Sequence, residues 1–508
     1  RYQNMAANNY MTSISAYGHG EGGAGKNGSK TIFGGHSHVG TMVYLGDNWP
    51  EQYRGNLYTH NLHGSQMNRE FLVKKDSAYQ SYSYGQDQLY SADKEYLGVH
   101  LKYGPDGAVY FSDWADKQQC HNNNAEIWNR TNGRIYRMVW KETFKPTKID
   151  LANTSSADLI KYLQHPNEWY SHMTQHLLRQ RKAAGEDLTS IADQLRTLIL
   201  NPNGKNLIRT FYALDACGGL TDETYRKLLN SKNEHLAKLA LLSLTERPKE
   251  KTKQFGPQLI ELSKTTPFAT LRLHLAGICQ TRFAEPFARQ ILQTLAMNTD
   301  DANDRFIPSM IWFSYSKYLS NNRDAAAVLA ATTPIPSLRR SIYWKLAQID
   351  LNQAMGYALE LPNEQLTGVL GAFDQALLHQ KSVPAPSNWN KLLVKTTNLS
   401  DPEGKRYVAA LNTKFGLKKI DLAALKAERV KAQKQVFMVC AACHAPDKNQ
   451  PGPSLQEISK VYNNKADIIK WIKKPGHKRK EYPQMPGFPN MEKKDLELVA
   501  EYLLSLKK

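Results

Sequence analysis

The chain has 508 residues, of which 41% are hydrophobic and 10% aromatic, and its net charge is +19. Such a composition is typical of folded proteins and excludes a wholly disordered chain. A chain of this length exceeds one hydrophobic core, so we expect roughly three or four domains. The sequence contains no run of about eighteen apolar residues, which excludes a membrane-spanning helix within it.

The positive charge does not indicate a nucleic-acid-binding protein, because lysines and arginines are dispersed over the whole length. The densest basic cluster lies near the C-terminus and comprises Lys470, Lys473, Lys474, Lys478, Arg479 and Lys480. A surface for docking an acidic redox partner, or an ordinary solvated face, explains this cluster better. The sequence starts with RYQNMAANNY, without an initiator Met or a signal-peptide pattern. We therefore expect a fragment whose export signal, with any membrane association, lies upstream.

Residues 1–145 consist of short apolar runs between turns, namely TMVYLGDNW, GNLYTHNL, GAVYFSDW and GRIYRMVW. β-Branched and aromatic residues bounded by Gly, Asp or Pro are typical of strands. The GPDG segment at 104–107 predicts a turn that leads directly into the strand AVYFSDW. Repeated short antiparallel strands indicate part of a β-propeller or a sandwich.

Residues 150–422 change to a helical period. Apolar stripes recur at helical spacing with turn signals between them, at Leu207, Phe211 and Leu214, at Leu271, Leu275 and Ile278, and at Leu366, Leu370, Phe373 and Leu377. We expect a stack of helix pairs, a HEAT-like solenoid in which the stripes form the core. The single thiols Cys120, Cys217 and Cys279 have no close cysteine neighbour and do not indicate a disulfide framework.

Residues 423–508 form the third expected domain. A helical segment leads to the motif CAACH, a loop-rich stretch follows, and a final helix carries Leu496, Val499, Leu503 and Leu506 on one face. Two terminal helices around a poorly structured middle need a staple or a cofactor in a domain of about eighty residues. The fold class is thus multidomain: β-propeller part, all-α solenoid, all-α C-terminal domain.

The CAACH motif is the attachment pattern of c-type haem, in which Cys440 and Cys443 bond to the vinyl groups and His444 is the fifth iron ligand. A zinc site needs a second ligand pair at similar spacing, and His477 stands alone. A thioredoxin-like pair would follow a strand, whereas this pair ends a helical segment. Both alternatives are therefore weaker than the haem interpretation.

Attached haem predicts a sixth ligand downstream. Met485 lies forty-one residues after His444, between prolines that hold its thioether in place. Met491 is the competitor, at the mouth of the final helix. Pro453, in the GPSL segment, is expected to orient the His444 imidazole through its carbonyl.

Residues from about 426 to 508 resemble a class I cytochrome c. The resemblance rests on Phe437 three positions before Cys440, CAACH, GPSL, YPQMP and a final helix that carries Tyr502. It implies one covalent haem c, a potential raised by the Met ligand and maturation outside the cytoplasm, in the periplasm or another exported compartment.

The N-terminal part resembles the closing blades of glucose/sorbosone dehydrogenase propellers, through the segments at 34–69 and 101–137. The order of the three domains, with HPNEWYSHMTQHLLRQR and DRFIPSMIWF, resembles the membrane-bound dehydrogenase-like haem proteins of planctomycetes. This resemblance implies pyrroloquinoline quinone, calcium and a catalytic histidine, without placing them. The candidate base or calcium-ligand residues are His36, His38, His63, Arg69, Asp113, Asp116 and His121. Of these, the two histidines of the HSH segment, His36 and His38, and the adjacent Cys120 and His121 are the least readily explained as ordinary loop residues.

We therefore expect a periplasmic electron-transfer protein that forms part of a quinone-dependent sugar or alcohol dehydrogenase and passes electrons to a redox protein or respiratory-chain acceptor. The alternative is a non-enzymatic propeller and solenoid that binds a polysaccharide or a protein, with the haem as a redox relay. A haem peroxidase is disfavoured because Met485 would fill the open iron position.

Overall fold

The computed structural model describes residues 38–62, 65–84, 87–93, 95–115, 131–201, 203–281, 283, 287–397, 399–417, 431, 433, 435–445, 447–449, 451–476 and 481–506. The chain divides into two compact units, residues 1–342 and 343–508, and each is described by itself. In the first unit the last described strand ends at Met138 and the first described α-helix starts at Ser156. The predicted boundary near residue 423 lies outside the described residues.

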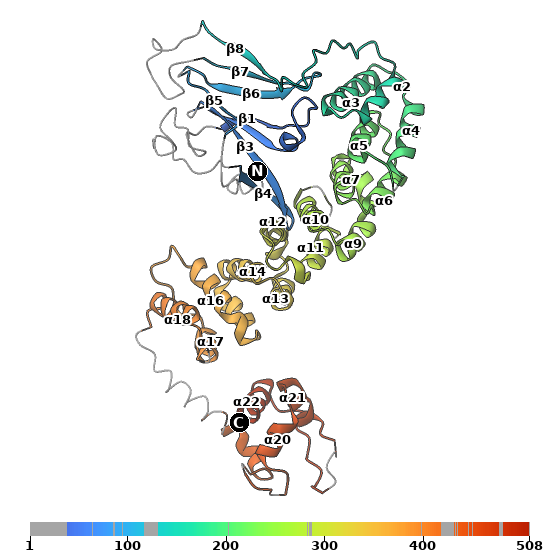
Figure 1. Ribbon diagram of the computed structural model, residues 1–508. Coiled ribbons are helices and arrows are strands. Elements are labelled where there is room, and N and C mark those ends of the chain that lie inside the picture. Colours follow the sequence, from blue (N-terminus) through green and yellow to red (C-terminus); the bar gives the residue numbers. More distant parts are fainter. Residues whose placement is uncertain are drawn as a thin grey trace. The chain divides into compact units, whose positions relative to one another are not determined.

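Two antiparallel sheets form the strand-rich part, as Figure 1 shows. The strands are β1 (His38–Val43), β2 (Leu57–Asn61), β3 (Gln66–Lys75), β4 (Ala78–Ser83), β5 (Leu89–Tyr90), β6 (Gly98–Tyr103), β7 (Val109–Asp113) and β8 (Arg134–Met138), with a short helix η1 (Glu51–Tyr53). The first sheet has the order β1-β2-β3-β4, with β5 paired to β3, and the second has the order β6-β7-β8. The predicted turn at 104–107 joins β6 to β7, with Gly107 at φ +71° and its N–H donating to the Gly104 carbonyl at 3.0 Å.

The core of this part lies between the two sheets, and one tyrosine ends a predicted strand early. The segment TMVYLGDNW continues as a strand only to Val43. Beyond it, the backbone N–H groups of Asn48 and Trp49 donate to the Tyr44 hydroxyl at 3.1 and 2.8 Å. That hydroxyl donates to the Gly107 carbonyl at 2.8 Å. The chain therefore turns around a buried side chain, which the local strand pattern did not indicate.

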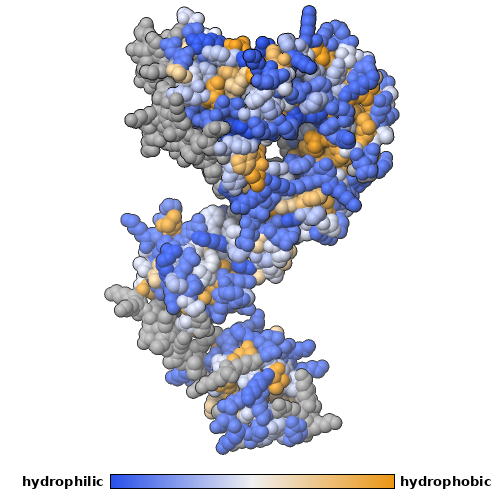
Figure 2. Space-filling view, in the orientation of Figure 1, coloured by the Kyte–Doolittle hydropathy of each residue, from blue (hydrophilic) through white to orange (hydrophobic). Residues whose placement is uncertain are grey.

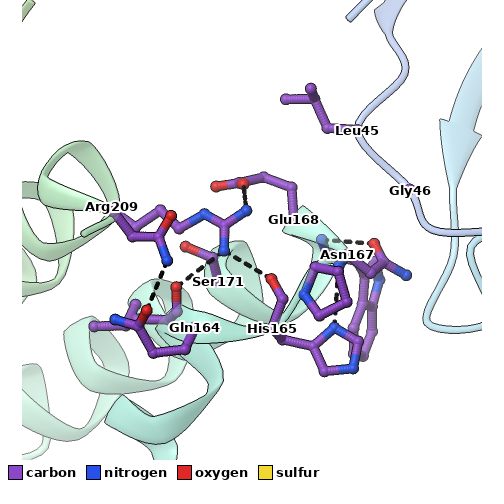
Figure 3. A network of polar contacts seen from close by, with 12 residues as sticks. Leu45, Gly46, Gln164, His165, Asn167, Glu168, Ser171 and Arg209 are labelled. Carbon is purple, nitrogen blue, oxygen red and sulfur yellow. Dashed lines mark hydrogen bonds and ion pairs between the residues drawn. The ribbon is translucent and has the colours of Figure 1, made fainter. Parts of the chain in front are cut away.

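Polar contacts hold the sheets against the first helices. The side chain of Asn167 donates to the Gly104 carbonyl at 2.9 Å, and Arg54 donates to the carbonyls of Leu45 and Pro166 at 2.7 and 2.8 Å. Near this junction, Arg209 points toward the turn between Gln164 and Glu168 and forms an ion pair with Glu168 at 2.5 Å, as Figure 3 shows. These contacts make the strand region and the first helices one body.

A second connection is made by the long hairpin of β3 and β4, which sequence analysis did not identify. At its tip, the backbone N–H and the hydroxyl of Ser77 donate to the Asp304 carboxylate at 3.0 and 2.9 Å. Asp304 also accepts from the backbone N–H groups of Phe306 and Ile307, both at 2.8 Å. One carboxylate thus starts a helix and anchors the hairpin.

The middle of the chain is helical, as predicted, and its helices follow one another in sequence order (Figure 1). In residues 1–342 they are α2 (Ser156–Leu159), η3 (Ile160–Gln164), α3 (Glu168–Ala183), α4 (Thr189–Ile199), α5 (Leu207–Ala216), α6 (Asp222–Leu229), α7 (Glu234–Glu246), α8 (Lys249–Lys253), α9 (Gly256–Thr265), α10 (Ala269–Thr281), α11 (Phe287–Leu295), η4 (Thr299–Asp301), α12 (Ile307–Leu319) and α13 (Arg323–Thr332). Helix α14 (Pro336–Ile349) crosses the boundary, and α15 (Leu351–Ala358), α16 (Asn363–Ala376), α17 (Trp389–Thr396) and α18 (Pro402–Lys414) follow.

The predicted apolar stripes lie in the helical core. Phe211, Leu275 and Leu370, one from each stripe, are at most 2% exposed. Side-chain donors also meet carbonyls 36 to 38 residues earlier in the chain, at recurring positions. The donor and acceptor pairs are Ser314 and Ala276, Lys317 and Cys279, Thr333 and Ala296, Lys395 and Leu359, and Lys414 and Leu377. Contacts of this kind connect helices that lie 36 to 38 residues apart in the chain.

In the described part of the chain, no helix is both long enough and apolar enough to cross a membrane. The face seen in Figure 2 is mainly hydrophilic, with small hydrophobic patches between hydrophilic side chains. Scattered apolar patches of this kind are normal on folded proteins.

Candidate haem-binding site

The CAACH motif begins in the last turn of a helical segment, residues 435–441. Helical spacing turns Phe437 and Cys440 inward, at 7% and 8% exposure, and leaves Met438 outward at 70%. The N–H groups of Cys443 and His444 both donate to the Cys440 carbonyl at 3.1 Å. This tight turn brings the imidazole to the inner face, where His444 is 9% exposed, while Cys443 is exposed.

The orientation of the His444 ring is set by the segment before α20 (Leu455–Val461). Its Nδ1 lies 2.8 Å from the Pro453 carbonyl, and because a carbonyl can only accept, Nδ1 carries the proton and donates. Gly452 packs against the ring so closely that a Cβ there would come within 2.6 Å of Cε1. The Nε2 lone pair of His444 is therefore left for a metal ion.

An apolar cavity lies beside this imidazole, with an empty volume of about 970 Å³ including its open mouth. It is lined by Phe437, Cys440, His444, Pro453, Leu455, Ile458, Val461, Tyr462, Ile468, Trp471, Ile472, Gly476, Tyr482, Pro483, Met485, Val499 and Leu503. Met485 is half-buried and lines the cavity, whereas Met491 packs on the same core without lining it. Its predominantly apolar lining suits a large, mostly apolar cofactor.

The groups around the cavity fit a covalently attached haem. Cys440 and Cys443 are free thiols, and burial together with the neighbouring Cys443 raises the pKa of the Cys440 thiol. Two thiols, an imidazole with a free Nε2 and a thioether are the donor set of a c-type haem with a Met ligand. Among all residues that the structure describes, no group of three or more His, Cys, Asp or Glu side chains is placed to hold a metal ion.

Three helices build the wall of the cavity: α20, α21 (Lys465–Lys473) and α22 (Lys493–Ser505). The stretch expected to be loop-rich therefore contains two helices, because Ser454 and Asn464 cap their first turns through side-chain oxygens. Leu496, Val499 and Leu503 of α22 are buried, as the sequence pattern predicts. Tyr502 of the same helix packs on Phe437, with ring centroids 5.2 Å apart, so the first and last helical segments of the domain meet.

Of the strand-region candidates that the structure describes, Arg69 and Asp113 have well-defined partners. The Arg69 guanidinium lies between the rings of Tyr53 and Tyr84, 4.2 and 4.0 Å from their centroids, and donates to the Gln52 carbonyl at 2.6 Å. Asp113 is buried and accepts from the N–H groups of Leu97 and Ala115 at 2.9 and 2.8 Å. Both side chains are used in holding the fold.

The other strand-region candidates are less informative. His38 is half-buried at the start of β1, opposite Asn61 of β2. His36, His63, Asp116, Cys120 and His121 lie outside the described residues, as does His477 near the C-terminus.

Two residues of the loop beside His444, Gly452 and Asn449, were not among the predicted site residues. Gly452 was readable as part of GPSL, because a glycine next to a ring-orienting proline indicates close packing. Asn449 had no local signal: its role depends on a contact with Ser454 that only the folded loop creates.

Two stretches of the chain match known protein families. Residues 4–142 match Domain of unknown function (DUF7133), and residues 430–507 match Cytochrome c. No curated protein and no solved structure matches the chain. The cytochrome c match covers CAACH, the Pro453 segment and the cavity with Met485. The C-terminal part of this protein is therefore a class I cytochrome c domain, which implies haem c and electron transfer.

Proposed function

We propose that this protein is an exported electron-transfer protein whose haem c is bonded to Cys440 and Cys443 and ligated by His444 and Met485. The observation that carries the proposal is an apolar cavity bordered by the first cysteine, the oriented imidazole and the thioether. Bound haem supplies a one-electron couple, and a Met ligand raises its potential. The protein is thus suited to accept electrons from a substrate-oxidising partner.

The chain's own residues prepare this site in three ways. Pro453 holds the His444 ring by accepting from Nδ1 at 2.8 Å, which also makes the imidazole a stronger donor. Ile468 and Ile472, both buried, keep water from the cavity wall. The exposed Cys443 leaves one edge of the site at the surface, where electrons can enter and leave.

The test is a haem assay on the chain produced in a periplasm competent for cytochrome c maturation. A pyridine haemochrome assay should give one covalent haem per chain, and the haem should survive denaturing electrophoresis. The double variant Cys440→Ser with Cys443→Ser removes both attachment points and should lose all covalent haem. The matched control, Cys217→Ser with Cys279→Ser, alters two buried thiols elsewhere and should keep it. Absence of covalent haem from the unaltered chain would overturn the proposal.

For the electron source, we propose a quinone-dependent sugar or alcohol dehydrogenase, with the strand region as part of a β-propeller and the helices as a HEAT-like solenoid. Two adjacent antiparallel sheets and the contacts repeated at 36 to 38 residues support these fold assignments. Pyrroloquinoline quinone and calcium come from the resemblance alone. Haem reduction by a sugar in the presence of both would support an enzyme.

The alternative function is a carbohydrate- or protein-binding module with a redox relay. One observation favours it: Arg69 and Asp113 are both occupied by structural contacts. Carbohydrate binding without reduction of the haem would support this alternative over the dehydrogenase.

We further propose that an acidic redox protein docks at α21. Lys470, Lys473 and Lys474 are exposed, while Ile468 and Ile472 of the same helix line the cavity. Opposite charges accelerate association and are screened by salt. Lys473→Glu with Lys474→Glu should slow electron transfer to an acidic acceptor about tenfold at low salt and flatten its salt dependence. The control, Lys249→Glu with Lys251→Glu on α8, should leave the rate unchanged, and an equal loss in both variants would contradict the docking site.

A further inference from the structure

The loop between His444 and α20 is closed by backbone hydrogen bonds. The Gly452 N–H donates to the Cys443 carbonyl at 3.0 Å, and the Leu455 N–H donates to the Ala445 carbonyl at 2.9 Å. These two bonds bring the segment before α20 alongside the CAACH turn. The Pro453 carbonyl is thereby placed against His444 Nδ1, at 2.8 Å.

One side chain from the same loop reaches the other end of this contact. Asn449 Oδ1 accepts from the Ser454 N–H at 2.8 Å. The Pro453 carbonyl and the Ser454 N–H belong to one peptide group, which is planar and rigid. Asn449 and His444 therefore grip the two ends of a single peptide plane, one as acceptor and one as donor.

Both consequences of this arrangement act on the imidazole. A fixed N–H end fixes the direction of the carbonyl at the opposite end of the plane. A hydrogen bond at the N–H also polarises the peptide, so its carbonyl becomes a better acceptor for Nδ1–H. A stronger bond at Nδ1 increases the electron density at Nε2, the atom that faces the metal.

We propose that Asn449 is a positioning residue that tunes the reduction potential of the haem through the Pro453–Ser454 peptide and His444. The inference rests on the proposed ligation by His444. A more electron-rich imidazole favours the ferric state, so the hydrogen bond from Ser454 to Asn449 lowers the potential. Its loss raises it.

Folding of the loop does not depend on Asn449 alone. Asn449 is exposed, and the two backbone hydrogen bonds donated by Gly452 and Leu455 do not involve its side chain. Ser454 also caps α20, with its hydroxyl accepting from the Glu457 N–H at 3.3 Å. The variant Asn449→Ala should therefore retain haem.

The same domain offers a matched control. Asn464 Oδ1 accepts from the Asp467 N–H at 2.9 Å, which is the same kind of bond at nearly the same length. It caps α21 and has no bond to the Pro453–Ser454 peptide. Asn464→Ala removes this bond, and also the one that Asn464 Nδ2 donates to Asp467 Oδ2 at 2.8 Å, without touching the peptide that holds His444.

The experiment measures two properties of the haem-loaded chain: its reduction potential and the NMR shift of the His444 Nδ1 proton in the reduced state. Asn449→Ala should raise the potential and move this proton upfield, as expected for a weaker hydrogen bond. Asn464→Ala should change neither. Asn449→Asp keeps an acceptor oxygen and should retain the proton shift of the unaltered chain.

The outcomes separate this inference from the proposed function. If the unaltered chain binds no covalent haem, the proposed function fails. If haem is bound but Asn449→Ala shifts neither property, or Asn464→Ala shifts both equally, only the role of Asn449 is overturned. An upfield move of the His444 Nδ1 proton in Asn449→Asp, like that expected in Asn449→Ala, would likewise overturn the role of Asn449, because the acceptor oxygen would then be irrelevant.

Discussion

Replacement of Met485 by alanine is expected to abolish the visible-absorption signature of Met ligation and to lower the reduction potential of the haem. Met485 is the methionine that lines the apolar cavity beside His444, and it lies between Pro483 and Pro486. A Met ligand stabilises ferrous iron relative to ferric iron, so its removal favours oxidation. Covalent haem should remain, because both cysteines are unchanged. Spectroelectrochemistry of the purified variant measures both effects together.

The matched control is Met491→Ala. Met491 is also half-buried and packs on the core of the same domain, but it does not line the cavity. This substitution should cost stability while the spectrum and the potential stay unchanged. An unchanged spectrum in Met485→Ala together with a lost signature in Met491→Ala would transfer the ligand role to Met491.

Acidification is expected to weaken the strand region through His60, which lies in β2 and is fully buried between the sheets. Burial lowers the pKa of His60 from 6.5 to about 4. The unfolded chain therefore binds a proton between these values that the folded chain does not bind. The contribution of neutral, buried His60 to the free energy of unfolding is fully present above pH 6.5. As the pH falls to 4, about 3 kcal/mol of this contribution is lost.

Amide hydrogen exchange in β2, β3, β6 and β7 measures this loss locally, without requiring that the whole chain unfold in one transition. Burial raises the pKa of Asp87 to about 6, which acts in the opposite direction, so the comparison is made with the variant His60→Leu. The difference in opening free energy between the two chains should change by about 3 kcal/mol from pH 7.5 to pH 4. His100→Leu, at an exposed position of β6, is the control and should give no such change. Equal pH dependence in His60→Leu and the unaltered chain would contradict the prediction.

Local patterns predicted much of this protein because their causes are local. The CAACH motif is recognisable since two thiols and an imidazole must sit at fixed positions on one helical turn, and the family match confirms a cytochrome c domain there. The apolar stripes predicted the helical region because a helix repeats its buried face every three or four residues. Leu275 and Phe373, taken from two of these stripes, are fully buried.

Predictions that needed long-range contacts were less complete. The strand expected through Trp49 ends at Val43, because the chain turns around the Tyr44 hydroxyl, which reaches Gly107. Arg69 and Asp113 were candidate functional residues in the sequence. In the folded chain, two tyrosine rings enclose the guanidinium, and backbone N–H groups occupy the carboxylate.

The sequence by itself determined the CAACH pattern of the cytochrome c domain, the period of the helical region and the apolar face of the last helix, since each depends on residues within a few positions of one another. Only the tertiary structure decided that Met485 rather than Met491 lines the cavity, and that Asn449 and His444 meet one peptide. The physical reason is that these contacts join residues that are separated along the chain. They form only when the loop folds back on itself, and the local sequence does not specify how it does so.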